Sequence, residues 1–392
     1  MRKGLIFLVL GYVLSQFYRA FLAVMTPYLA ADIGATPEDL ARASGLWFVA
    51  FALSQIPIGW ALDHIGPRLT AAVPLAVLGG GGAFLFAAAQ GPGTITLAMI
   101  LIGAGCAPVL VAAYYIYARE FPPAMFGTLA GATLGFGSFG NIAGTVPLAY
   151  CVADFGWRPT VVGVGILTLA TAAALARFIH DPERLPHHAQ IKGSVFALFR
   201  EPSLWFIAPM MVAGYAPAAD IRGLWVGPHL HDVYGLGATG IGRVSLLMGL
   251  AMVAGSFAYG PLDRLFHTRK WVVFVGNILA MICLFALWLL PQAGVWTTAL
   301  LLAALGFTGA SYPAVMSHGR GFFPPHLVGR GVTLLTLVGI GGTGIMQVVT
   351  GYIHAAVAVP PAAAPYAEIY LFFAIFVAVA LVLYAFSADR TD

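Results

Sequence analysis

The sequence predicts an all-α membrane protein with twelve transmembrane helices in two pseudo-symmetric six-helix bundles. The chain of 392 residues is 60% hydrophobic and only 9% charged, whereas soluble domains carry about 25% charged residues. Short motifs of the first half recur about 200 residues later, a sign of duplication. The sequence lacks the alternating segments of about 10 residues that are typical of an outer-membrane barrel.

Apolar segments long enough to cross a hydrocarbon layer of about 30 Å recur along the whole chain. Their expected ranges are 4–31, 43–62, 70–90, 94–118, 127–152, 159–178, 203–230, 242–262, 271–290, 295–317, 328–358 and 367–386. The first segment follows Arg2 and Lys3, as the core of a signal peptide does. It is longer than a signal core of about 7–15 residues, so we interpret it as a retained helix.

The longest polar stretch, 177–202, follows the sixth apolar segment and marks the joint between the halves. We therefore expect a first bundle over 1–178, a cytoplasmic linker over 179–202 and a second bundle over 203–392. Six helices is an even number, so both halves enter the membrane in the same direction. This places the pseudo-two-fold axis along the membrane normal.

The repeat carries one arginine in each copy. Gly11-Tyr12, six residues and Arg19 recur as Gly214-Tyr215, six residues and Arg222. Three further repeated pairs are Asp32 with Asp232, Asp63 with Asp263, and Gly127 with Gly329. A duplicated half with an arginine at the same place predicts a membrane protein with a two-fold site.

The distribution of basic residues predicts the orientation. Most of the 19 lysines and arginines fall on the side of the membrane that holds both termini, and such an excess is typical of the cytoplasmic side. We expect a multi-pass protein of the cytoplasmic (inner) membrane with both termini cytoplasmic. The pI of about 9.0 then reflects topology, and no nucleic-acid partner is expected.

The loop between the second and third segments reads Gly-Trp-Ala-Leu-Asp-His-Ile-Gly-Pro-Arg over 59–68. It resembles the signature loop of the major facilitator superfamily, although His64 and Pro67 stand where basic residues are usual. A degenerate copy follows the eighth segment. The resemblance implies that the aspartate caps and pairs with neighbouring helix ends in the outward-open state. The implied conformational latch consists of Gly59, Asp63, Gly66, Arg68, Asp263 and Arg264.

Two further motifs are similar to those of the family, Gly156-Trp157-Arg158 before the sixth segment and Asp181-Pro182-Glu183-Arg184 after it. Together the motifs and the duplication cover nearly the whole chain. The resemblance implies a secondary active transporter that works by alternating access. Two departures weaken particular branches: 98–103 lacks the arginine of many proton-linked members, and 137–144 lacks the proline of the antiporter signature.

Arg19 lies about 15 residues into its segment, or about 22 Å from the start of a helix. An arginine at such depth costs about 2.5–3.5 kcal/mol, so it should face a cavity or a partner. Arg222 is its symmetry mate, and two planar guanidinium forks suit a carboxylate or phosphate. The pattern resembles the organophosphate branch of the family. We expect the substrate to be a small organic anion, a carboxylate or phosphate ester.

Asp220 leaves two alternatives open for these arginines. In one, Asp220 is their structural counter-ion. In the other, it is the coupling candidate whose protonation frees an arginine. Asp220 and Arg222 are about 200° apart on an ideal helix, so an ion pair between them requires a distorted segment. Asp220 has no acidic counterpart in the first half, where Phe17 stands at the equivalent position.

Further polar and aromatic side chains are candidates for the substrate-binding site because they adjoin the arginines or lie on helices that line the cavity in this family. They are Tyr18, Trp225, Asn141, Gln347, Tyr114 and Tyr312. The expected partners are a small-molecule substrate, a coupling ion (proton or counter-anion) and the lipid bilayer. We expect a monomer with no cofactor. We also expect no metal site, because Met248 and Met252 are better explained as a methionine pair packed in the core.

Two other functions stay open. One is an exporter of amphipathic or drug-like compounds, with an aromatic cavity and structural arginines. The other is a non-transporting membrane receptor. An enzyme is not expected, because the sequence contains no Ser/His/Asp set, HExxH motif or phosphate loop.

Overall fold

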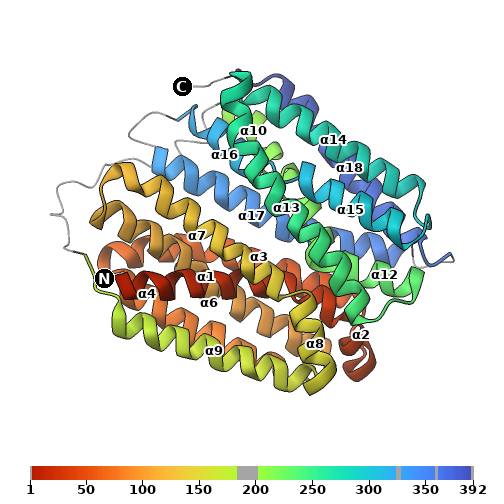
Figure 1. The fold of residues 1–392 in the computed structure, drawn as a ribbon, viewed down its shortest axis with the longest axis horizontal. Helices are drawn as coiled ribbons and strands as arrows, with labels where there is room; N and C mark the ends of the chain where they lie inside the picture. Colours follow the sequence, from red (N-terminus) through yellow and green to blue (C-terminus); the bar gives the residue numbers. More distant parts are fainter. Residues whose placement is uncertain (1, 183–201, 324–327, 358–360, 390–392) are drawn as a thin grey trace. The chain divides into compact units, whose positions relative to one another are not determined.

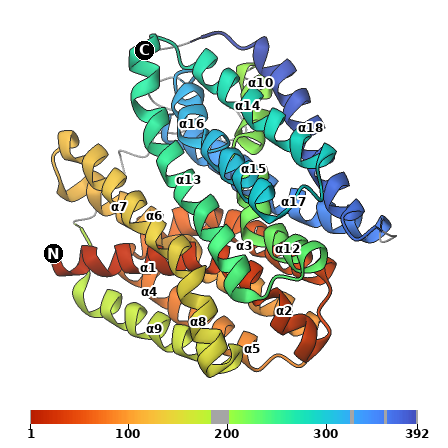
Figure 2. The same cartoon turned by 45° about the vertical axis from the view of Figure 1, so that its right-hand side comes forward.

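We describe the protein from a computed structural model. The described residues are 2–182, 202–323, 328–357 and 361–389. Within these ranges every regular element is a helix, as the sequence predicts. The chain divides into two compact units, Met1–His188 (unit 1) and Ala189–Asp392 (unit 2), drawn in Figures 1 and 2. Most of the expected linker lies outside the described residues, so the predicted domain boundaries stay a prediction.

Unit 1 folds the first six apolar segments as helices. Its elements are α1 (Arg2–Ala20), α2 (Leu22–Ile33), α3 (Pro37–His64), α4 (Pro67–Pro74), the π-helical stretch η1 (Leu75–Gly80), α5 (Gly81–Ala87), α6 (Pro92–Glu120), α7 (Pro123–Ala143), α8 (Val146–Phe155) and α9 (Trp157–Phe178). The first segment is bent, because α1 and α2 meet at 52°. The fifth segment is divided at Gly144 into α7 and α8.

Unit 2 folds the other six segments. Its elements are α10 (Pro202–Ala213), α11 (Ala216–Asp220), the π-helical stretch η4 (Ile221–Trp225), α12 (Val226–Tyr234), α13 (Ala238–Phe266), α14 (Lys270–Leu289), α15 (Val295–Thr308), α16 (Tyr312–Arg320), α17 (Val328–Ala356) and α18 (Ala364–Ala385). The seventh segment is thus the most irregular of this unit, and it contains Arg222.

The number of membrane spans agrees closely with the prediction. Over the described residues, ten helices are long and apolar enough to cross a membrane, and the bent pair α1–α2 makes an eleventh. The helix at the remaining predicted position is α7, which runs over 21 residues. The count of twelve stays a prediction at this position.

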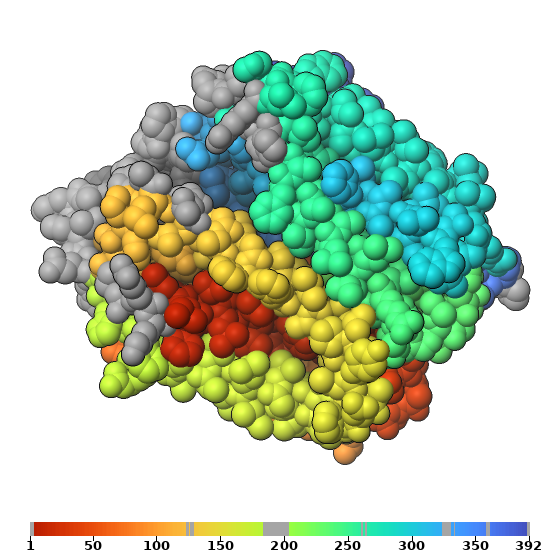
Figure 3. Space-filling model, in the orientation of Figure 1, coloured from red at the N-terminus to blue at the C-terminus, as the bar shows by residue number. Residues whose placement is uncertain are grey.

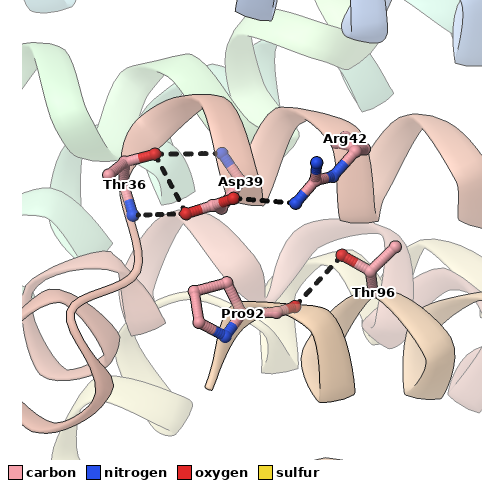
Figure 4. A network of polar contacts seen from close by, with 5 residues as sticks. All are labelled: Thr36, Asp39, Arg42, Pro92 and Thr96. Carbon is pink, nitrogen blue, oxygen red and sulfur yellow. Dashed lines mark hydrogen bonds and ion pairs between the residues drawn. The ribbon is translucent and has the colours of Figure 1, made fainter.

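The starts of α3 and α6 show why helices begin at these residues. The Thr36 hydroxyl accepts a hydrogen bond from the Asp39 amide at 3.2 Å, and the Asp39 carboxylate accepts one from the Thr36 amide at 3.2 Å (Figure 4). This capping box satisfies amides that the first turn of a helix leaves unpaired. Arg42 donates to Asp39 at 2.8 Å. Pro92 occupies the first turn of α6, where its missing N–H costs nothing.

Equivalent glycines set the helix spacing in the two units. A Cβ on Gly11 would lie 2.9 Å from Val109 of α6, and one on Gly214 would lie 2.7 Å from the Ser311 hydroxyl. Both distances are too short for a real Cβ. The repeated glycine therefore lets the first helix of each unit approach its fourth span closely, as small residues do in membrane helices.

A second glycine pair has the same role on the fifth and eleventh predicted spans. A Cβ on Gly140 of α7 would overlap the backbone carbonyl of Val13 on α1, and a Cβ on Gly342 of α17 would lie 2.5 Å from Val212 of α10. Figure 3 shows α1, in red, between α7 and α9. The glycine-rich helices of both units thus pack directly against the helices that carry the two arginines.

One acidic residue at the end of each arginine-containing segment accepts a hydrogen bond from an aromatic residue. The Asp32 carboxylate accepts from the Trp157 indole at 3.1 Å and from Arg158 at 2.9 Å. In unit 2, the Tyr366 hydroxyl donates to the Asp232 carboxylate. The Gly-Trp-Arg motif thereby fastens the start of α9 to the end of α2, and unit 2 repeats the fastening with tyrosine.

The Gly140 contact gives a test of this packing. Gly140→Ala should destabilise the protein by about 1–3 kcal/mol, because the added methyl forces α1 and α7 apart. Gly135→Ala on the same helix is the control, since a Cβ there meets nothing within 4 Å. The measurement is the melting temperature of the purified protein in detergent. Equal melting temperatures for the two variants would contradict the packing described here.

Candidate functional site

Arg19 is buried at the end of α1, next to the bend that separates α1 from α2. Its side chain is 9% exposed. The guanidinium carbon lies 5.0 Å from the ring centre of Trp47 and 4.7 Å from that of Phe51, both on α3. Phe48 of the same helix lies at 5.8 Å. Aromatic faces attract a cation, so α3 stabilises the charge of Arg19.

Arg222, the symmetry mate, is 5% exposed and lies in η4. A Cβ on Gly249 would stand 4.0 Å from the Arg222 Nη1 atom, so the guanidinium extends toward α13. π-Helical turns are rare and frequently occur at functional sites. In both units the repeated arginine therefore lies where the regular helix is interrupted, by a bend in unit 1 and by a π-helical turn in unit 2.

Asp220 does not form an ion pair with Arg222. The ion pairs in the described part of the chain are Arg42 with Asp39 and Arg158 with Asp32. Asp220 is fully buried, and Gln347 of α17 is the polar side chain whose amide is close enough to influence its carboxyl group. Neither side chain makes a hydrogen bond of regular geometry within the described residues. The structure therefore directs Asp220 toward α17 and Arg222 toward α13.

Trp225, one turn beyond Arg222, belongs to a buried cluster. Its indole donates to the Thr350 hydroxyl at 2.9 Å, and its ring stacks on His354 at 5.2 Å. His354 in turn meets the edge of Tyr366 at 5.0 Å. Trp225 thus joins η4 to α17 and α18, and its polar atom is engaged within unit 2.

The other predicted binding residues differ in burial and in the side chains that they contact. The Tyr18 hydroxyl is 3.0 Å from that of Thr168 on α9, and Tyr18 is 1% exposed, so it points into the core of unit 1. Tyr114 and Asn141 are half-buried on α6 and α7. Tyr312 is half-buried, stacks obliquely on Tyr215 at 5.2 Å and packs over Gly339. Whether these side chains contact a substrate stays a prediction.

Sequence reasoning missed the aromatic residues around Arg19. Trp47 and Phe51 are four residues apart on α3, so they share one helix face, and this spacing is visible in the sequence. Nothing in the sequence indicates that this face meets Arg19, because the contact joins helices whose packing is set by the tertiary fold. His354 was missed for the same reason.

The signature loop of unit 1 is clamped to the end of α9. Gly66 has a φ of 102°, and a Cβ there would lie 2.6 Å from the Asp181 carboxylate. That carboxylate accepts a hydrogen bond from the Arg68 amide at 2.9 Å, while Arg68 Nε donates to the Ala176 carbonyl at 2.6 Å. The motif glycine is therefore required both by its backbone conformation and by the approach of Asp181.

The remaining latch residues are not engaged in this clamp. Gly59 is exposed on α3, and a Cβ there would meet nothing within 4 Å. Asp63 is exposed and lies within electrostatic range of Tyr115 on α6. The side chains of Asp263 and Arg264 lie outside the described residues. Their latch function stays a prediction.

Unit 2 repeats the clamp of unit 1 with different residues. Asp389, after α18, accepts hydrogen bonds from the Thr268 hydroxyl and from the Lys270 amide at 3.1 Å. Lys270 Nζ donates to the Ala385 and Ser387 carbonyls at 2.7 and 2.8 Å. In each unit an aspartate caps the start of the third helix, and a basic side chain caps the end of the sixth.

Comparison with known proteins identifies the family. The sequence model of the Major Facilitator Superfamily matches residues 8–242. Over 182 residues the chain is 25% identical to the uncharacterized transporter YybO of Bacillus subtilis (strain 168), a match that spans 46% of this chain and 41% of that protein. The chain thus matches less than half the length of this curated relative.

Solved structures of similar fold cover nearly the whole chain. A bacterial homolog of the human lysosomal transporter Spinster, in an inward-facing and occupied conformation, has a TM-score of 0.79 at 18% identity and covers 98% of this chain and 96% of its own. A D-xylose-proton symporter has a TM-score of 0.78 at 13% identity, with 98% of each chain covered. The nucleoside transporter NupG has a TM-score of 0.76 at 14% identity, also with 98% of each covered.

The sequence model spans more than half of the chain, so the chain belongs to the Major Facilitator Superfamily. The family predicted from the motifs is therefore confirmed, as is the all-helical membrane fold. At 13–18% identity the solved structures show a common fold, and fold alone does not determine substrate.

The clamp of unit 2 predicts a dependence on pH. Partial burial raises the pKa of Asp389, but hydrogen bonds from Thr268, Lys270 and Arg269 outweigh it and hold the pKa below its usual range. The clamp should be intact above the unfolded pKa of about 3.9 and should be lost as the pH falls through the lower folded value. Asp389→Asn should weaken it at every pH at which the wild-type carboxylate is ionised. Hydrogen exchange at the Lys270 amide measures both effects, with the exposed Asp154→Asn as control. Unchanged protection in Asp389→Asn would rule the clamp out.

Proposed function

We propose that this protein is a secondary active transporter that moves a small organic anion, a carboxylate or phosphate ester, across the cytoplasmic membrane by alternating access. Membership of the superfamily supports transport, and the transporters named above share the fold. We also propose that both termini lie in the cytoplasm and that the protein acts as a monomer.

One observation carries the choice of an anion. Each unit buries a single repeated arginine, Arg19 or Arg222, at an interruption of its first helix. Burial of a guanidinium in a membrane helix is costly, so such residues mark substrate or ion pathways. The charge of Arg19 also lies over the aromatic rings of Trp47 and Phe51, whose faces stabilise a cation at this depth. A guanidinium binds carboxylate or phosphate through two parallel hydrogen bonds.

A second candidate function has its own supporting observation. The rings of Trp47, Phe48 and Phe51 around Arg19 also suit a flat amphipathic compound. In an exporter of such compounds these rings would bind the substrate and Arg19 would be structural. The two functions differ in what removal of the arginine charge does.

Uptake by purified protein in liposomes tests the proposal. We expect Arg19→Gln and Arg222→Gln each to lower uptake of the transported carboxylate or phosphate ester by about 10–100-fold, since a hydrogen bond to a charged group contributes about 1.5–3 kcal/mol. Arg19→Lys and Arg222→Lys keep the charge and lose the planar fork, so they should retain part of the uptake. Arg42→Gln, at an exposed ion pair, is the matched control.

Two results would contradict the anion site. One is full uptake by correctly inserted Arg19→Gln and Arg222→Gln. The other is a wild-type protein that transports neutral amphipathic dyes and none of a panel of carboxylates and phosphate esters, which would favour the exporter.

A further inference from the structure

Asp220 and Gln347 form a buried polar pair that the anion site does not use. Both side chains are fully buried, Asp220 on α11 and Gln347 on α17. Both carboxylate oxygens of Asp220 and both terminal atoms of Gln347 lack a hydrogen bond of regular geometry within the described residues. Buried polar groups are nearly always hydrogen-bonded, so such a cluster needs a chemical explanation.

The charge state of Asp220 follows from its surroundings. The facing polar group from α17 is the neutral amide of Gln347, α10 has no ionisable side chain, and Arg243 of α13 is exposed. Among the described residues, the buried arginine and histidine side chains on the packed elements are Arg222, which extends toward α13, and two histidines. His354 of α17 stacks on Trp225, and His229 of α12 is bonded to Tyr370. An isolated buried carboxylate is strongly disfavoured, and neutralisation by a proton removes the cost.

The π-helical stretch η4 supplies a way to change this arrangement. It begins at Ile221, between Asp220 and Arg222. A π-helical turn contains one residue more than an α-helical turn, and moving that residue along the helix rotates neighbouring positions by about 100° relative to each other. The same backbone can therefore hold Asp220 against α17, as here, or bring it toward Arg222.

We propose that Asp220 and Gln347 are the proton-binding pair of the transporter, and that the coupling ion is a proton carried in the same direction as the anion. The inference rests on the proposed function and assigns Gln347 to the proton rather than to the substrate. With Asp220 protonated against Gln347, its carboxylate no longer competes with the anion for Arg222. When the anion leaves, Asp220 releases its proton to water and the carboxylate pairs with Arg222. One proton and one negative charge thus enter and leave together.

Infrared spectroscopy of the purified protein tests the pair without knowledge of the substrate. A protonated carboxylic acid has a carbonyl-stretching band separate from that of a carboxylate. At neutral pH we expect such a band in the wild type, its loss in Asp220→Asn, and a change in its frequency in Gln347→Leu. Asp232→Asn, which removes an exposed acid from α12, is the control and should keep the band.

A pH titration of the band tests the link to the arginine. In Arg222→Gln the band should persist to higher pH than in the wild type, because the ionised carboxylate has lost its counter-charge. A sodium titration of the wild type should leave the band unchanged.

Any of three results would overturn the proton pair. They are a wild-type protein with no carboxylic-acid band at neutral pH, a band that survives in Asp220→Asn, and a band that sodium abolishes. The first and third results are measured on the wild type. The inference can therefore be tested even if Asp220→Asn misfolds. These results are independent of uptake by the arginine variants, so failure of the proton pair and failure of the anion site are distinguishable.

Discussion

The free-energy cost of a charge inside a membrane-spanning helix constrains both units of this chain. Each unit buries its repeated arginine in such a helix, and unit 2 also buries Asp220. The surroundings reduce the cost in different ways: aromatic rings of α3 face Arg19, whereas η4 directs Arg222 and Asp220 to different neighbouring helices. Helix interruptions and close glycine contacts are where the fold accommodates these charges.

The two units share further features besides the repeated arginine. Glycines at equivalent positions let the first helix of each unit approach its neighbours, and an aspartate at the end of each sixth helix caps the start of the third. These fastenings hold each unit together near its ends. One difference between the units lies in the seventh segment, where Asp220 and η4 have no counterpart in the first.

Much of the fold could be predicted because helix ranges depend on local hydrophobicity and the repeat is visible in the residues themselves. The family followed from the loop at 59–68, and the structure explains Gly66 by its positive φ and by Asp181. The site was less predictable. The direction of Tyr18 toward Thr168, the rings beside Arg19 and the contact of Asp220 with Gln347 each join helices far apart in the sequence. The π-helical turn that separates Asp220 from Arg222 has no pattern that sequence periodicity reveals.

We propose that the two repeated arginines bind one class of ligand, an organic anion. A thermal-shift screen of purified protein against carboxylates, phosphate esters and neutral amphipathic compounds tests it most directly, since a ligand that binds the folded state raises the melting temperature. We expect particular anions to stabilise the wild type and Arg42→Gln but neither Arg19→Gln nor Arg222→Gln. Equal stabilisation of all four proteins by the same anion, or stabilisation by neutral compounds alone, would contradict it.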